Sequence, residues 1–426
     1  MATNPTNNAF VDNSLTDLVN VRAAEVAGYL TVGANSYFGD QLVGKRNGQE
    51  YTFVIKDNGK YVRGKDITGK GSTLKERSVK KKVQVGNVMV DTDFVEAVTD
   101  VNWDKEIAQP NGKELIEGLT IDVINDDLGR ANTAFVGEGF QPLTKANSFL
   151  SSISTEKKYG FVDPMIDSIM ASWGQSFKPV DNVAPLDAKG ELTRIGSTDY
   201  RFQQFLPSFE ISADLANELA SATVSSYTAE QTIPASAINE NADDDDEAVV
   251  DLITLSGVSE DIPKGTPLFI EDVMATNFVG NKTSSPKAFI VVAQKQAGQV
   301  YVRTVDFGAK GLGTKEAIFK DGTLVTAGGL SGKKLVKPIA EGLYYTGLVR
   351  LNGTMEFDTL KKQDWSNAEL TSSGVEGITV HCARAVNVEA GTNKTRWCVA
   401  ALAGIVEPRG VTYVCIKDSL PNRVVL

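Results

Sequence analysis

The chain has 426 residues, of which 42% are apolar and 23% are charged, and it contains a single histidine, His381. This apolar content excludes a wholly disordered chain, and the length predicts two or three domains. Histidine is the commonest proton carrier near neutral pH and the commonest metal ligand, so its near absence argues against a His-dependent hydrolase or a zinc enzyme. No run of 18 apolar residues is present to span a membrane.

The net charge of −11 is distributed unevenly along the chain. Residues 45–82 hold twelve lysines and arginines against four carboxylates, a net charge of +8, whereas residues 1–44 carry −3 and the rest −16. A basic segment in an acidic protein indicates binding either to nucleic acid or to an acidic face of another copy of the chain.

The three cysteines, Cys382, Cys398 and Cys415, all lie in the last part of the chain. The first residues show no basic region followed by an apolar one, so no secretory signal is expected. An odd number of cysteines in such a chain predicts reduced thiols in a cytoplasm. We expect all three to be buried as small apolar side chains.

The first half of the chain contains two helix patterns and one hairpin pattern. Apolar residues at steps of three and four predict an amphipathic helix over 13–31 and a long helix over 110–135. Between them, residues 50–90 predict an extended hairpin with a glycine- and lysine-rich tip and an alternating return arm over 79–90. A two-stranded hairpin has too little core to be stable alone, so we expect it to lie on another surface.

Further along, Phe161 and Val162 end a strand, and Asp163-Pro164 predicts the start of a helix that Gly174 ends. Between 222 and 338, short β patterns separated by glycine-rich turns predict a small barrel or sandwich. These patterns cover 249–255, 266–273, 288–294 and 299–307. Longer strand patterns follow at 342–351, 377–386, 397–406 and 411–416, so the β-rich part is expected to be an insertion.

Several motifs that suggest chemistry have simpler explanations. Gly64–Lys70 has the spacing of a phosphate loop, but Gly71 stands where serine or threonine should bind magnesium, and the context is not strand-to-helix. The acidic run Asp243–Glu247 lacks the alternating ligands of a calcium loop and is expected to be a solvated loop. His381 lies in an alternating strand and is expected to be packed or interfacial.

A group of carboxylates on the long helix, Asp122, Asp126 and Asp127 near Glu117, is expected to form a solvated face. We therefore predict no catalytic residue, no cofactor and no metal. Lysines 80–82 and Arg77 have aromatic residues nearby, as in proteins that bind single strands. In a strand, however, Lys81 faces away from its two neighbours, which favours a protein–protein contact over nucleic acid.

Two short motifs resemble a known family. The run Leu255-Ser-Gly-Val-Ser-Glu-Asp-Ile-Pro-Lys-Gly-Thr-Pro-Leu-Phe-Ile270 is similar to a small-Gly-Val, apolar, Lys-Gly-Asp pattern that enters a barrel strand, with Thr266 and Pro267 where Asp and Val are usual. Phe161-Val-Asp-Pro164 is similar to a strand-to-helix entry. With the order of the elements, they resemble major capsid proteins of tailed bacteriophages, the Hong Kong 97-type fold, and among them coat proteins of short-tailed Salmonella-type phages, which carry an insertion domain.

The resemblance implies an α+β fold with an N-terminal arm, an extended loop, a spine helix, peripheral and axial domains and an inserted small β-barrel. The implied divisions are the arm 1–44, the extended β-hairpin loop 45–90, the peripheral domain 91–155 with a spine helix at about 108–135, the axial domain 156–227, the insertion 228–337 and the completion of the axial and peripheral domains 338–426.

The function that the resemblance implies is an icosahedral virion shell of hexamers and pentamers, assembled in the host cytoplasm around double-stranded DNA without sequence-specific binding, with a scaffolding protein and a portal as partners and no membrane. We expect the inter-subunit contact to use Arg63, Lys65, Lys70, Arg77, Lys80, Lys81 and Lys82. The alternative is a nucleic-acid-binding accessory or packaging protein that uses residues 45–82.

Overall fold

The computed structural model describes residues 16–24, 27–36, 50–56, 76–93, 108–166, 168–169, 194–240, 242, 246–308, 315–359, 370–375, 378–387 and 392–419. The chain divides into two compact units. The first contains Met1–Thr52, Lys80–Val123 and Met355–Gly404, and the second contains Phe53–Val79, Ile124–Thr354 and Ile405–Leu426. Helices and strands are mixed, so the predicted α+β class is confirmed. No helix in the described ranges has both the length and the apolar character to cross a bilayer.

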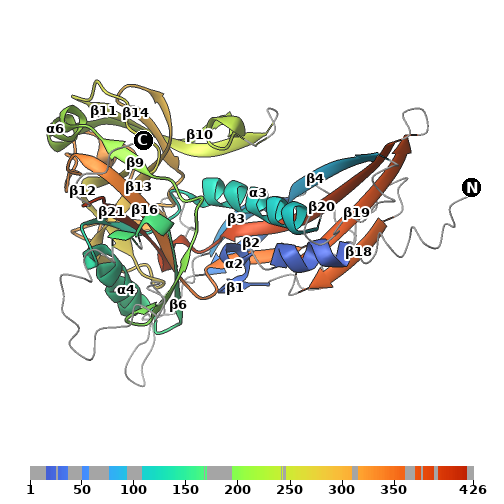
Figure 1. Ribbon diagram of the computed structural model, residues 1–426. Helices are drawn as coiled ribbons and strands as arrows, with labels where there is room; N and C mark the ends of the chain where they lie inside the picture. Colours follow the sequence, from blue (N-terminus) through green and yellow to red (C-terminus); the bar gives the residue numbers. More distant parts are fainter. Residues whose placement is uncertain are drawn as a thin grey trace, which may run out of the picture. The chain divides into compact units, whose positions relative to one another are not determined.

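The first unit is built on a six-stranded sheet (Figure 1). Its strand order is β1 (Ala34–Asn35), β17 (Met355–Thr359), β20 (Thr392–Ile405), β19 (Ile378–Asn387) and β18 (Leu370–Val375), and β4 (Gln84–Asp93) also pairs with β20. His381 lies opposite Cys398 in the β19–β20 register and is 1% exposed. The expectation that His381 is packed is therefore confirmed.

Two helical segments pack in the same unit. The N-terminal pattern forms a helix over 16–24 and the short helix α2 (Gly28–Thr31), with a turn at Ala27 between them. Val19 and Leu30 are buried as the pattern requires, but Leu18 is 37% exposed. The helix α3 (Gln109–Asp127) lies against β4, where a methyl group on Gly86 would be 3.4 Å from the backbone oxygen of Leu115.

The predicted hairpin is divided in the structure. Strand β2 (Glu50–Lys56) pairs with β3 (Glu76–Lys82) as a two-stranded sheet, which we call the basic ribbon. The return arm was expected to continue to residue 90, but it breaks at Val83, and β4 then pairs with β20 along its whole length. The long β20 offers β4 ten paired positions, more than the seven-residue β2 could give.

The prediction of a helix to residue 135 is wrong, because α3 ends at Asp127. Gly129 adopts φ +92°, a left-handed conformation that ends helices and favours glycine. Any larger residue there would also contact Arg303 and Val292 at 3.0 Å. The chain continues into β5 (Thr133–Gly137), and Phe135 packs edge-on against Phe149, with ring centroids 5.9 Å apart.

The second unit contains a seven-stranded sheet. Its order is β5, β21 (Val411–Lys417), β16 (Gly342–Leu351), β6 (Lys158–Val162), β8 (Thr198–Phe202) and β7 (Arg194–Ile195), with β9 (Phe209–Ile211) also on β16. The strand patterns at 342–351 and 411–416 match β16 and β21. Asp163 accepts a hydrogen bond from the Met165 backbone nitrogen (2.7 Å), so the predicted helix start after β6 is confirmed.

One helix of this unit had not been expected. Helix α4 (Gln141–Ile153) buries one face in the core of the unit, with Leu143, Phe149 and Leu150 packed near Val162 and Val414. No side chain caps its first residue, and its other face carries serines, a threonine and a lysine. Pro142 in the first turn is a helix start signal, and Leu143, Ala146, Phe149 and Leu150 recur at helical spacing. The sequence therefore carried a signal for this helix that was not used.

A second six-stranded sheet comes from one continuous segment between β9 and β16. Its order is β10 (Thr223–Pro234), β11 (Glu247–Ser256), β14 (Gln299–Arg303), β13 (Lys282–Gln296), β12 (Pro267–Thr276) and β15 (Ala317–Phe319), with every pair antiparallel. The short helices nearby are α6 (Ala213–Ser221), η4 (Ala235–Ala237), η5 (Gly328–Leu330) and, before β21, η6 (Pro408–Gly410). Four predicted strands match β11 to β14, while closure into a barrel stays a prediction.

Two glycines of α3 provide a matched test of this packing. A methyl group on Gly112 would lie 2.5 Å from the backbone oxygen of Val19 and 3.0 Å from Arg22, whereas nothing lies within 4 Å of one on Gly118. We expect Gly112→Ala to destabilise the protein by about 1–3 kcal/mol because the helix over 16–24 must move away. Gly118→Ala should stabilise it by up to about 1 kcal/mol because alanine favours helix. Thermal unfolding of both variants measures this, and equal midpoints would contradict the packing.

Candidate functional site

The predicted contact residues fall on two parts of the chain. Arg63, Lys65 and Lys70 lie outside the described residues, as does the phosphate-loop-like motif at 64–71. Arg77, Lys80, Lys81 and Lys82 all lie on β3 of the basic ribbon. Lys81 is only 9% exposed within the single chain. The role of these residues as a contact stays a prediction.

The carboxylates and the histidine of the sequence motifs are dispersed over separate elements of the described residues, namely α3, the start of β11 and β19. No three His, Cys, Asp or Glu side chains there group closely enough to hold a metal ion. Asp246 and Glu247 are described, while Asp243 to Asp245 are not. The remaining candidate sites in the described residues are buried charged side chains and one pocket.

The charged face of α3 differs from the expectation of a solvated surface. Glu117 does pair with Lys113 one turn away, at 3.4 Å. Asp127, however, is fully buried and accepts a hydrogen bond from the backbone nitrogen of Ile405 (2.7 Å). The prediction of a solvated face is wrong for Asp127, because the last residue of β20, Ile405, covers its carboxylate.

Two cations bind the last turn of α3: Arg303 of β14 and Lys264 of the loop between β11 and β12. Arg303 donates to the backbone oxygen of Asn125 (2.9 Å) and lies 3.6 Å from Asp126. Lys264 donates to the side-chain oxygen of Asn125 (2.8 Å) and to the Ile238 carbonyl (2.6 Å). Burial lowers the pKa of Arg303 to about 10, so it stays charged at neutral pH. Positive groups at this end of a helix are stabilised by its dipole.

The residues just after α3 are bound equally closely. Asn132 donates to the carbonyls of Thr276 (2.8 Å) and Arg409 (2.9 Å). Lys287, which is 1% exposed, donates to the Ala131 carbonyl (3.1 Å) and lies 3.6 Å from Glu316. We call residues 125–133 the junction segment. It is held by hydrogen bonds from both sheets of the second unit, so its role is structural.

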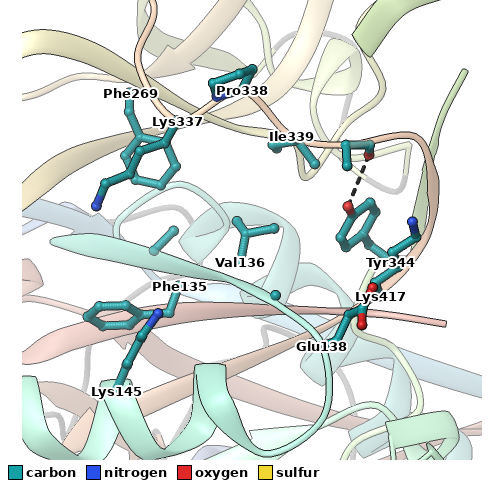
Figure 2. A pocket seen from close by; sticks show the side chains of 13 residues that line it. Phe135, Val136, Glu138, Lys145, Phe269, Lys337, Pro338, Ile339, Tyr344 and Lys417 are labelled. Carbon is teal, nitrogen blue, oxygen red and sulfur yellow. Dashed lines mark hydrogen bonds between the residues drawn. The ribbon is translucent and has the colours of Figure 1, made fainter. Parts of the chain in front are cut away.

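A pocket of about 550 Å³ lies in the second unit, beyond the junction segment (Figure 2). One wall comes from β5 with the residue after it, Glu138, and from Lys145 of α4. The opposite wall comes from Phe269 of β12 and from residues 337–340. Figure 2 shows Tyr344 and Lys417 side by side at one end, with the Tyr344 hydroxyl donating to the Ala340 carbonyl (3.0 Å).

Charge and apolar surface are combined in this pocket. Lys145, Lys337 and Lys417 line it together with a single carboxylate, Glu138. The Lys337 ammonium lies 5.8 Å from the centre of the Phe269 ring. Burial and the nearby charge of Lys145 lower the pKa of Lys337. The pocket therefore has the chemistry of a site for an anion that carries an apolar group.

No local pattern in the sequence marks these lining residues. The three lysines, Lys145, Lys337 and Lys417, lie in three separate segments of the chain. Only the topology, with β5 and β16 on either side of β21, brings them to one place. Lys337 has a positive φ of 54°, and the next residue is a proline. Residues before proline favour an extended backbone, so local sequence preferences do not predict this conformation.

Comparison with solved structures finds similar chains among viral shells and one virus-like particle. The chain is similar to the capsid of Ralstonia phage GP4 (TM-score 0.40, 9% identity, covering 91% of this chain and 93% of that one). It is similar to the acid-stable capsid of Helicobacter pylori bacteriophage KHP30 (TM-score 0.40, 8% identity, 91% and 90%). It is also similar to a virus-like particle from Pyrococcus furiosus (TM-score 0.36, 9% identity, 94% and 97%). No family model and no curated protein matches the chain.

The cysteines provide a test of burial in this structure. Cys382, Cys398 and Cys415 are free thiols and are at most 3% exposed, which confirms the expected burial. Burial raises the pKa of Cys398 to about 11 and raises that of Cys415 as well. At pH 8 the thiolate form of Cys398 is then only about one part in a thousand.

We therefore expect the native protein at pH 8 to give no rapid reaction with a disulfide reagent such as dithionitrobenzoate. The same protein in guanidinium chloride should release colour equivalent to all three thiols. A thiol that reacts within seconds in the native protein would contradict the burial described for that strand.

Proposed function

We propose that this chain is the major capsid protein of a tailed bacteriophage, a subunit that assembles into the icosahedral shell around the packaged genome. The observation that carries the proposal is the order of the elements: an N-terminal helical segment, a basic two-stranded ribbon, a strand leading into a long helix, and a sheet whose strands come before and after an all-β segment. This is the order that the sequence resemblance implies for the Hong Kong 97-type fold.

The basic ribbon supports self-association. Among the described strands, β2 and β3 pair only with each other, and a lone two-stranded ribbon is marginally stable in water. Residues 45–82 carry +8, whereas the chain outside the first 82 residues carries −16. A neighbouring copy therefore offers an acidic surface to this segment, and opposite charges guide such docking.

In this proposal the divisions of the chain follow the resemblance. Residues 1–44 form an arm, 45–90 the extended loop, 91–155 the peripheral domain, 156–227 with 338–426 the axial domain and its completion, and 228–337 an inserted domain. Hexamers and pentamers would close the shell, because many weak contacts together stabilise a symmetric lattice.

The proposal extends to partners and location. A scaffolding protein and a portal would assist assembly in the host cytoplasm, and the finished subunit would belong to the virion. The acidic remainder suits a container that holds DNA without binding it tightly or by sequence. We assign the chain no enzymatic activity.

Electron microscopy tests the proposal directly. We expect negative-stain images of the protein, expressed alone and together with the proteins encoded beside it, to show closed shells, or sheets and spirals of hexamer-like units. Uniform small particles under both conditions would overturn the proposal. Strongly salt-dependent DNA binding by those particles would instead favour an accessory protein that uses residues 45–82.

Charge reversal on the ribbon tests the contact itself. We expect the double variant Lys80→Glu, Lys82→Glu to stay folded but to form no shells, because four units of charge are changed on the docking segment. Lys81 is left unchanged because it is buried. The matched control is Lys295→Glu, Lys320→Glu, which makes the same charge change at exposed positions of the second six-stranded sheet. Sedimentation velocity gives the assembled fraction, and normal shells from the ribbon variant would contradict the docking role.

A further inference from the structure

The pocket of the second unit has a surplus of positive charge. Three lysines and one glutamate line it, and none of the four forms an ion pair within the described part of the chain. Lys145 and Lys337 approach from opposite walls, and burial together with the charge of Lys145 lowers the pKa of Lys337. A carboxylate between them would remove this repulsion and gain two charge-assisted hydrogen bonds.

Lys337 is held in an unusual backbone conformation. Its φ of 54° lies in the left-handed region, which costs a non-glycine residue free energy and is found where the surrounding structure requires it. The following residue, Pro338, fixes the direction of the chain along the pocket wall. The exposed Lys337 side chain places its ammonium group 5.8 Å from the centre of the Phe269 ring, at the edge of the pocket.

The walls between the lysines are largely apolar. Phe135 and Val136 form one side, and Phe269 and Ile339 form the other (Figure 2). Tyr344 adds no anion, because burial raises its pKa to about 12 and its hydroxyl proton is already donated to Ala340. A ligand must therefore supply both an apolar group and the negative charge.

We propose that this pocket binds a peptide segment of a partner protein in which a large apolar side chain is flanked by carboxylates. The volume of about 550 Å³ falls within the usual range of ligand pockets, roughly 300–1,000 Å³, and is large enough for a phenylalanine side chain with parts of its neighbours. The apolar group contacts Phe135 and Phe269, and the carboxylates bind Lys145 and Lys337. This inference goes beyond shell formation and holds for the single subunit.

Fluorescence anisotropy with labelled peptides tests it on the full-length protein. The probe is Gly-Glu-Asp-Phe-Asp-Glu-Gly, and two comparison peptides replace its acids by Gln and Asn or its Phe by Ala. We expect the probe to bind and each comparison peptide to bind roughly tenfold or more weakly, a loss of about 1.4 kcal/mol for each kind of contact. Equal binding of the uncharged peptide would overturn the proposal.

Variants locate the binding. Lys337→Glu and Lys145→Glu change exposed side chains, so both proteins should fold, and each should weaken the probe at least about tenfold. Lys334→Glu is the matched control, because it is an exposed lysine on the same segment but outside the pocket, and it should stay within about twofold of the unchanged protein. Loss of binding in the control to the same degree would overturn the proposal.

Two further results would assign the pocket to another occupant and so overturn the proposal. Dodecanoate that binds at this pocket while the peptide does not would indicate a small amphipathic anion. The second result is self-association without peptide. If the unchanged subunit self-associates and the Lys337→Glu variant does not, the occupant is a second copy of the chain.

Discussion

The packing of the second unit depends on how the backbone carbonyl groups at the end of α3 are hydrogen-bonded. The last turn of a helix leaves backbone carbonyls without partners inside the helix, and burying them unbonded costs free energy. Here Arg303 donates to the Asn125 carbonyl within that last turn. Lys287 donates to the carbonyl of Ala131, in the segment that follows the helix. Both cations belong to the second six-stranded sheet. A cation that replaces water at these carbonyls also fixes the strand that carries it, so the helix end and the sheet are held together.

The same junction segment sets the position of the pocket. Asn132 donates to Thr276 at the end of β12 and to Arg409 just before β21, and β5 begins at the next residue. Phe135 of β5 and Phe269 of β12 both line the pocket. Their separation is thus fixed by hydrogen bonds within a few residues of each wall. A pocket held in this way is preformed, which reduces the entropy cost of binding.

The regular strands were predictable from the sequence. The features that depend on contacts between distant residues, such as the end of a helix or the burial of a carboxylate, were not. β16 has the bounds of its sequence pattern, because its aromatic and branched residues favour a strand and most of the strand is buried. The end of α3 was misplaced because the apolar spacing continues to residue 135, whereas the left-handed φ of Gly129 ends the helix and the close approach of Arg303 leaves no room for a larger residue there. Asp127 gives a similar lesson, since a carboxylate on a polar helix face carries no signal that a backbone nitrogen 278 residues away will cover it. The lysines of the pocket are distributed over three segments, so no local pattern could group them.

Two positive surfaces of this chain differ in what they require from a partner. The basic ribbon combines a high density of charge with few paired strands, so it needs an extended acidic surface that also satisfies backbone groups. The pocket combines three lysines with an apolar interior, so it needs one large side chain with carboxylates beside it. A flat acidic surface docked on the pocket would leave its apolar walls in contact with water. A single inserted side chain would cover too little of the basic ribbon. The two proposed contacts therefore call for partners of different shape and chemistry.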